Sequence, residues 1–302
     1  MLKKNDFPCF YIDSDSASKK AQKLYKAITW LTLILMFIST ILGSINPSIT
    51  NEIDHFDSIN GIILFSSGLI TIYLNYQAPE RSWYLGRAIA ESMKTLTWRY
   101  MMHADPFFNG EPKDDLRIFT ERISAINRQA NQDKFIPKPN KAHKDIITVK
   151  MEEIRGLSFK ERKEFYSKYR INEQIKWYEN KSEFNGRAAK ICSIIIISCQ
   201  LLAAIYVFNF IETAKVFNLN NILIFLATSI ISIVELNKYK EIYQSYALTK
   251  QELNIIRTKF KEIQNDTELN EFVLEAEQAI SREHTMWLAR RGNSEYLTKL
   301  NS

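Results

Sequence analysis

The chain has 302 residues, enough for one large or two ordinary domains, and its formal net charge is +6, from 40 Lys and Arg against 34 Asp and Glu. Hydrophobic residues make up 46% of the sequence, which excludes a disordered chain, and 8 Gly and 7 Pro exclude a collagen-like or low-complexity one. The mean hydropathy of −0.22 averages over two opposite kinds of segment, because the apolar residues are concentrated in blocks.

Four of these blocks contain no charged residue and are long enough to cross a bilayer. A helix rises about 1.5 Å per residue and the hydrocarbon core is about 30 Å thick, so about 20 apolar residues suffice. The blocks are apolar on nearly every side, whereas a helix of a soluble protein keeps a polar stripe. We therefore predict an all-α integral membrane protein with four transmembrane helices in two hairpins, at residues 27–51, 58–79, 191–211 and 216–234.

Basic residues lie on one side of the predicted spans. The connection between the first two spans carries acidic residues but no Lys or Arg, whereas six lysines precede the first span. Further basic residues follow the second span, precede the third and follow the fourth. By the positive-inside rule, both termini and the long middle segment are cytoplasmic. The basic excess then reflects topology, so we expect a lipid bilayer as a partner and no nucleic acid.

Each predicted hairpin is followed by a charged segment with an apolar seam. After the second span, Ile89, Met93, Leu96 and Tyr100 recur at steps of three and four residues. This spacing predicts long cytoplasmic helical stalks that pack against partner helices. The seam after the fourth span consists of Tyr239, Ile242, Tyr246, Thr249, Leu253, Ile256, Phe260 and Ile263.

The two halves share letters at a constant offset of 154 positions. Glu121, Ala125, Ile126 and Arg128 match Glu275, Ala279, Ile280 and Arg282, each set following one of the stalks. Matching positions after matching hairpins indicate a tandem duplication. We expect a first two-span repeat at 1–132, a linker at 133–150 that contains helix-breaking prolines, and a second two-span repeat at 151–302. Near the start of the second repeat, an S-x-x-E capping box predicts a helix that begins after Ser158.

Two stretches resemble signature segments of the SLATT domains, two-span bacterial effector domains associated with SMODS nucleotide synthetases and SLOG sensors. They are ERSWYLGRAIAESMKTLTWRYMMHADPF, from residue 80, and IRGLSFKERKEFYSKYRINEQIKWYENKSEFNGR, from residue 154. The resemblance implies two fused SLATT domains in a multi-pass protein of the bacterial inner membrane. It further implies an antiphage or conflict system in which a nucleotide second messenger or a sensor protein triggers a membrane effector that forms pores.

The sequence lacks the motifs of common enzymes. It contains no Gly-rich phosphate loop, no G-x-S-x-G, no H-E-x-x-H and no paired Cys-x-x-Cys, and its four histidines are scattered. We therefore predict no catalytic residues, no metal site and no cofactor.

A charged stripe with an aromatic end lies on the first stalk, where Arg87, Glu91, Lys94 and Trp98 follow one another at helical spacing. Arg and Lys favour phosphate and Trp offers a stacking plane, so this stripe is a candidate docking face for a nucleotide or a partner protein. Intrahelical ion pairing and helix packing would explain the same spacing.

Polar residues recur on one side of the predicted spans, where they would either line a water-filled path or let helices pack closely. The candidate pore-lining residues are Ser67, Thr71 and Asn75 on the second span, Gln200 on the third, and Thr228, Ser232 and Glu235 on the fourth. We expect a homo-oligomer that permeabilises the membrane or conducts ions, because four helices with so little polar surface form a packed bundle. The alternative is a non-conducting membrane scaffold whose cytoplasmic helices recruit a partner protein.

Overall fold

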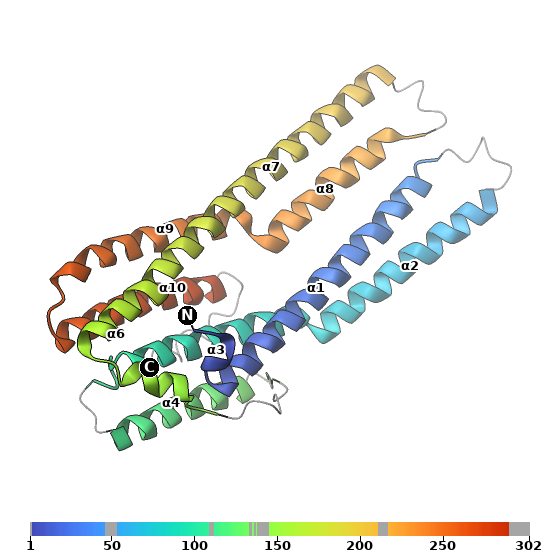
Figure 1. Ribbon diagram of the computed structural model, residues 1–302. Coiled ribbons are helices and arrows are strands. Elements are labelled where there is room, and N and C mark those ends of the chain that lie inside the picture. Colours follow the sequence, from blue (N-terminus) through green and yellow to red (C-terminus); the bar gives the residue numbers. More distant parts are fainter. Residues whose placement is uncertain are drawn as a thin grey trace. The chain divides into compact units, whose positions relative to one another are not determined.

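The computed structural model describes residues 2–45, 53–108, 112–132, 135, 137, 145–210 and 217–289, and within these ranges the chain is helical apart from turns, short connections and one isolated β-bridge. Figure 1 shows the helices in chain order. They are α1 (Cys9–Leu42), α2 (Ile53–Gln77), α3 (Pro79–Met101), α4 (Pro112–Gln132), α5 (Val149–Arg155), α6 (Phe159–Tyr166), α7 (Glu173–Phe210), α8 (Leu219–Asn237), α9 (Tyr239–Thr258) and α10 (Asp266–Ala289).

The chain divides into two compact units. The polar unit consists of Met1–Gln22, Glu80–Ser182 and Gln244–Ser302, and the apolar unit consists of Lys23–Pro79 and Glu183–Tyr243. The long helices α1 and α7 contribute residues to both units. The all-helical fold predicted from the sequence is thus confirmed for the described residues.

The apolar unit contains the predicted spans. Four helical segments are long and apolar enough to cross a membrane, and at most 11% of the residues in each apolar window are buried within the chain. Their leucine, isoleucine and phenylalanine side chains cover the outside of the unit, where lipid would surround them. The four predicted membrane-spanning segments are therefore confirmed by length and composition.

Contacts inside the apolar unit join the spans in pairs. The Ser39 hydroxyl of α1 bonds to the Asn60 amide of α2, and the rings of Phe37 and Phe225 stack at 5.8 Å between α1 and α8. Just after α1 and just before α8, an antiparallel bridge pairs Ile45 with Phe217. The two hairpins of the sequence thus pack as one four-helix unit (Figure 1).

Two residues in the left-handed conformation end the second and fourth spans. Ala78 has φ 40° between α2 and α3, and Lys238 has φ 52° between α8 and α9. A non-glycine residue rarely adopts this conformation, because its Cβ approaches the backbone closely. By contrast, α1 and α7 run without a break from the polar unit into their spans.

The polar unit holds most of the buried side chains, and the two predicted seams supply many of them. Met93 of α3 and Leu253 of α9 are fully buried, and most of the residues one helical turn away on either side are buried too. Tyr246 of the second seam packs against Trp177 and Tyr178 of α7, with ring centroids 5.1 and 5.4 Å apart. The heptad spacing correctly predicted that the seams pack against other helices, here helices of the same chain, while the cytoplasmic location of these stalks remains a prediction.

Corresponding faces of α4 and α10 are buried at the predicted offset of 154. Phe119 corresponds to Val273 and Ile123 to Glu277, and all four are buried. The second helix of each half thus turns its equivalent face inward. The expected linker at 133–150 lies mostly outside the described residues, and the domain boundaries remain a prediction.

Candidate functional site

A buried ionic cluster occupies the core of the polar unit, and we call it the Glu277 cluster after its acidic member. The Arg170 guanidinium donates two hydrogen bonds of 2.7 Å to the two carboxylate oxygens of Glu277, and both side chains are 1% exposed. The hydroxyls of Tyr166 and Thr95 donate to the same carboxylate at 3.0 and 2.9 Å. Four donor hydrogen bonds therefore hold one fully buried carboxylate.

Aromatic rings enclose this cluster. The Trp98 ring lies 5.8 Å from the Arg170 guanidinium carbon and meets the Tyr166 ring edge-on at 5.6 Å. Burial lowers the pKa of Arg170, but the charge and hydrogen bonds of Glu277 outweigh burial and raise the pKa above its usual range. Burial together with the charge of Glu277 raises the pKa of Tyr166. Both shifts favour the charged guanidinium and the neutral phenol that these hydrogen bonds require.

Four segments bring the cluster together. Thr95 and Trp98 come from α3, and Tyr166 is the last residue of α6. Glu277 comes from α10, whereas Arg170 lies in a π-helical turn, Ser167–Asn172, between α6 and α7. A π-turn shifts the side chains after it around the helix axis, and such turns are frequent at functional sites. Here the turn points Arg170 at the carboxylate of α10.

The cluster joins parts of the chain far apart in the sequence, and sequence reasoning identified only Trp98 among its members. One signal for Glu277 existed: it stands on the apolar face of α10, between Val273 and Ile280, where the first repeat has Ile123. A carboxylate buried on the apolar face of a helix costs free energy unless a buried partner pairs with it. Nothing in the sequence pattern identifies Arg170 as that partner. The π-turn changes the spacing of residues on each face of the helix, so a regular helical period does not predict where Arg170 points.

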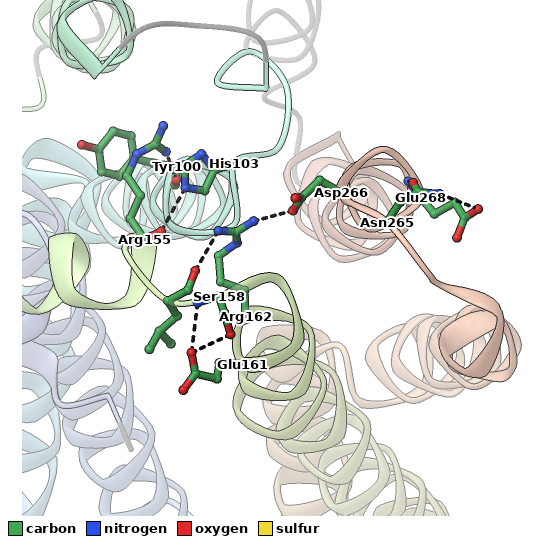
Figure 2. A network of polar contacts seen from close by, with 10 residues as sticks. Tyr100, His103, Arg155, Ser158, Glu161, Arg162, Asn265, Asp266 and Glu268 are labelled. Carbon is green, nitrogen blue, oxygen red and sulfur yellow. Dashed lines mark hydrogen bonds and ion pairs between the residues drawn. The ribbon is translucent and has the colours of Figure 1, made fainter.

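A second network ties the short middle helices to the rest of the polar unit (Figure 2). The Arg155 guanidinium of α5 donates to the Tyr100 carbonyl and to the buried Asp115 carboxylate, while the Arg155 carbonyl accepts from His103 Nε2 at 3.0 Å. Burial lowers the pKa of His103, with the charge of Arg155 acting in the same direction. The hydrogen bond to the Arg155 carbonyl opposes this shift, so the net effect is a lowered pKa that favours the neutral imidazole.

Arg162 of α6 connects the same region to α10. Its guanidinium pairs with Asp266, the first residue of α10, and donates to the Leu157 carbonyl at 2.9 Å (Figure 2). The predicted capping box is confirmed just before, where the Glu161 carboxylate accepts from both the backbone amide and the hydroxyl of Ser158. An acidic residue at the start of a helix also interacts favourably with the helix dipole.

The predicted docking stripe of α3 faces mainly into the polar unit. Arg87 is half-buried and donates to the Tyr246 hydroxyl at 3.3 Å, and Glu91 is also half-buried. Burial lowers the pKa of Lys94, although the neighbouring Glu91 opposes this shift. Trp98 is 2% exposed, so its ring has no open face for stacking. The docking role of the four residues remains a prediction.

The polar residues of the spans lie mostly on the outer surface of the apolar unit. Ser67 is buried against its neighbours, and its hydroxyl donates to the Leu64 carbonyl of its own helix. Lys238 pairs with the exposed Glu235 at the end of the fourth span. The remaining candidates are exposed on the chain: Thr71, Asn75, Gln200, Thr228 and Ser232. The four-helix unit therefore does not gather these residues around a path of its own.

Among the described residues, no group of three or more His, Cys, Asp or Glu side chains is placed to hold a metal ion. The thiols of Cys9, Cys192 and Cys199 are free.

Comparison with protein families agrees with this architecture of two similar halves. Residues 8–163 match the family described as SMODS and SLOG-associating 2TM effector domain 3, and this match covers more than half of the chain. Residues 166–287 match SMODS and SLOG-associating 2TM effector domain 1. The chain belongs to the SLATT family. It is a tandem SLATT protein, and the resemblance seen in the sequence is confirmed.

Each SLATT domain contributes two of the four candidate spans, in agreement with the two-transmembrane description of the family. The Glu277 cluster takes Thr95 and Trp98 from the first domain and Arg170 and Glu277 from the second. No curated protein and no solved structure matches the chain. The tandem SLATT protein is thus a four-span membrane protein whose two domains share one buried polar core.

Proposed function

We propose that this tandem SLATT protein is the membrane effector of a bacterial antiphage or conflict system and permeabilises the inner membrane as a homo-oligomer when a signal arrives. The family description, effector domains associated with SMODS and SLOG, supports the effector role. The protein acts by assembly in the bilayer and not as an enzyme. Its partners are the lipid bilayer, further copies of itself, and a nucleotide second messenger or a sensor protein.

The observation that carries the proposal is the outward position of the polar residues of the spans. A polar group that faces hydrocarbon costs free energy, so polar residues of membrane helices usually contact protein or water. Inside the unit, the spans meet mainly through small residues such as Cys199, Ala203 and Ala227, with the Ser39–Asn60 hydrogen bond as a polar contact. A water-filled path therefore fits between copies of the protein, where the exposed Asn75 and Glu235 would meet water. Thr71, Thr228 and Ser232 would lie beside this path, although their hydroxyls also donate to carbonyls of their own helices.

The charge distribution supports a cytoplasmic location for the polar unit. Lysines and arginines flank the spans on the side of the termini and the middle segment, as the positive-inside rule requires for a cytoplasmic side. The polar unit would then meet nucleotides and sensor proteins of the cytoplasm. An impermeant thiol reagent tests this in a variant without native cysteines: Lys141→Cys should be labelled only after the cells are permeabilised.

Flux across a reconstituted membrane tests the permeabilising activity. Purified protein in liposomes of phosphatidylethanolamine and phosphatidylglycerol should release a trapped dye or dissipate a K⁺ gradient as the protein-to-lipid ratio rises. Glu235→Lys should shift selectivity from cations toward anions, because a ring of carboxylates at a pore mouth attracts cations.

Glu271→Lys, an equal charge change on the exposed surface of α10, serves as the matched control and should leave the selectivity unchanged. Oligomers that pass no ions would instead support the scaffold, in which the polar unit recruits a partner protein and the spans only anchor it.

A further inference from the structure

Gln200 places an amide in the middle of the third span. The charge-free block runs from residue 191 to 211, so each end of the block is about 15 Å away along the helix. This distance is greater than a glutamine side chain can snorkel toward the headgroups. The side chain is exposed on the surface of the chain and has no hydrogen bond with the residues that the structure describes.

Hydrocarbon cannot satisfy an amide that carries two donors and an acceptor, so the side chain needs a partner from outside the chain. Several hydroxyls of the spans are already bonded to carbonyls of their own helices. Ser66 donates to Ile62 at 2.8 Å, Thr228 to Ile224 at 3.0 Å and Thr40 to Met36 at 2.8 Å. A second free amide, which both donates and accepts, therefore suits Gln200 better than these three hydroxyls.

We propose that Gln200 of one copy pairs with Gln200 of another and that α7 thereby forms a contact between copies. All copies enter the bilayer in the same orientation, so each presents its Gln200 at the same depth as the next. An amide is also complementary to itself, because it both donates and accepts. The inference rests on the proposed function, since it names the face through which the homo-oligomer assembles.

The residues around Gln200 form an exposed stripe that continues this contact. One face of α7 is used inside the chain, where Cys199 and Ala203 are 8% and 7% exposed. The stripe lies to one side of that face at steps of three and four residues. Its members, all exposed, are Ser193, Ile197, Gln200, Ala204 and Val207. The small side chains of Ser193 and Ala204, on either side of Gln200, allow the backbones of two helices to approach closely, as in many membrane helix pairs.

Disulfide cross-linking tests which face of α7 meets the second copy. In the full chain with Cys9, Cys192 and Cys199 replaced by alanine, Ala204→Cys should cross-link between copies upon oxidation in vesicles of phosphatidylethanolamine and phosphatidylglycerol. Leu202→Cys lies on the opposite side of the helix, is also exposed on the chain, and should cross-link at least several-fold more slowly. Equal rates at the two positions would overturn the proposal.

The amide itself is tested by energy transfer between labelled copies as the protein is diluted in vesicles. Gln200→Leu should weaken self-association about 3- to 30-fold, the range expected for one hydrogen bond between membrane helices. The double variant Gln200→Leu/Leu201→Gln keeps the composition but moves the amide about 100° around the helix. It should associate as weakly as Gln200→Leu.

These outcomes distinguish the proposed contact through Gln200 of α7 from the proposed permeabilising function. If the wild-type protein oligomerises and Gln200→Leu associates equally well, the contact through α7 is wrong while the oligomeric effector stands. A wild-type protein that stays monomeric contradicts both. If Ala204→Cys cross-links and Gln200→Leu weakens association but no ion flux occurs, the contact is right and permeabilisation is wrong.

Discussion

The polar unit buries its large apolar side chains within the chain, whereas the apolar unit leaves many of them exposed. In the polar unit, Met93, Leu253 and Phe119 are fully buried within the chain. In the apolar unit, Phe65, Leu201 and Ile62 leave 60–70% of their surface exposed. Water drives apolar groups into a core, whereas lipid tails are as apolar as leucine and do not.

The two units also differ in whether they bury charged side chains. The polar unit can bury the Arg170–Glu277 pair, because it also supplies hydrogen bonds from Tyr166 and Thr95. The described spans keep their charges at the ends, as with Glu235 and Lys238. The comparison shows that the specific interactions of this protein are concentrated in the polar unit, while the apolar unit is held by weaker and more general contacts.

Breaking the buried ion pair should have the largest effect of any single change. Glu277→Leu leaves the charge of Arg170 buried without its partner, which should cost about 3–5 kcal/mol of stability in the polar unit. The double variant Arg170→Met/Glu277→Leu removes both charges and should be much less destabilising. Urea titration of the full chain in detergent, followed by tryptophan fluorescence, measures both. If the double variant were as unstable as the single one, the charge of Arg170 would not be the cause.

The same leucine truncation in each unit tests the comparison directly. Leu253→Ala removes a fully buried side chain and should cost about 2–5 kcal/mol through lost burial and a cavity. Leu201→Ala removes a side chain that is 60% exposed on α7 and should cost less than about 1 kcal/mol. Thermal unfolding in detergent gives both values. A similar loss at Leu201 would show that the outer face of α7 is packed, for instance by another copy.

Two glycines offer a smaller test of packing density. A Cβ at Gly86 in the polar unit would lie 2.8 Å from the Phe135 ring and 3.0 Å from the Ser18 Cβ, so Gly86→Ala should cost about 1–3 kcal/mol. A Cβ at Gly68 in the second span would have no neighbour within 4 Å. Gly68→Ala should therefore be neutral or slightly stabilising. The midpoints of thermal unfolding of the two variants check this difference.

The smallest expected effect concerns pH. Burial lowers the pKa of His103 below its ordinary value of 6.5, so the unfolded chain binds a proton more readily than the folded one. The stability from the neutral imidazole is complete above pH 6.5 and is lost as the pH falls toward the folded pKa. His103→Asn keeps a residue that tolerates the φ of 52° and should weaken the dependence on pH. Urea midpoints at several pH values below 7 provide the test, and an identical slope in the variant would contradict it.

The sequence predicted the features that depend on composition and period. Charge-free blocks predicted the four spans, and heptad spacing predicted that Met93 and Leu253 face inward, because burial in a helix follows its period. The Ser158–Glu161 cap was predictable because its hydrogen bonds are local. Arg170 was not, because its partner lies about a hundred residues away and a π-turn interrupts the phase between them.

The orientation of the α3 stripe was ambiguous for a related reason. Arg87 and Trp98 have the residue types of an exposed docking face, yet α3 contacts other helices on several sides and Trp98 is buried. Helical spacing alone cannot tell how many sides of a helix are covered. For the spans, the outward position of Thr71 and Gln200 also depends on which faces the hairpins use, and period alone does not give this.

The left-handed residues at Ala78 and Lys238 bear on how the chain tolerates changes in length. A residue inserted within α7 rotates every later position about 100° around the helix, so an insertion before Gln200 would turn the amide off its face. An insertion beside Ala78 or Lys238 falls where the helix is already interrupted and can be absorbed without rotating a span. Variation in chain length should therefore accumulate after the second and fourth spans and be rare in α1 and α7, which have no such break.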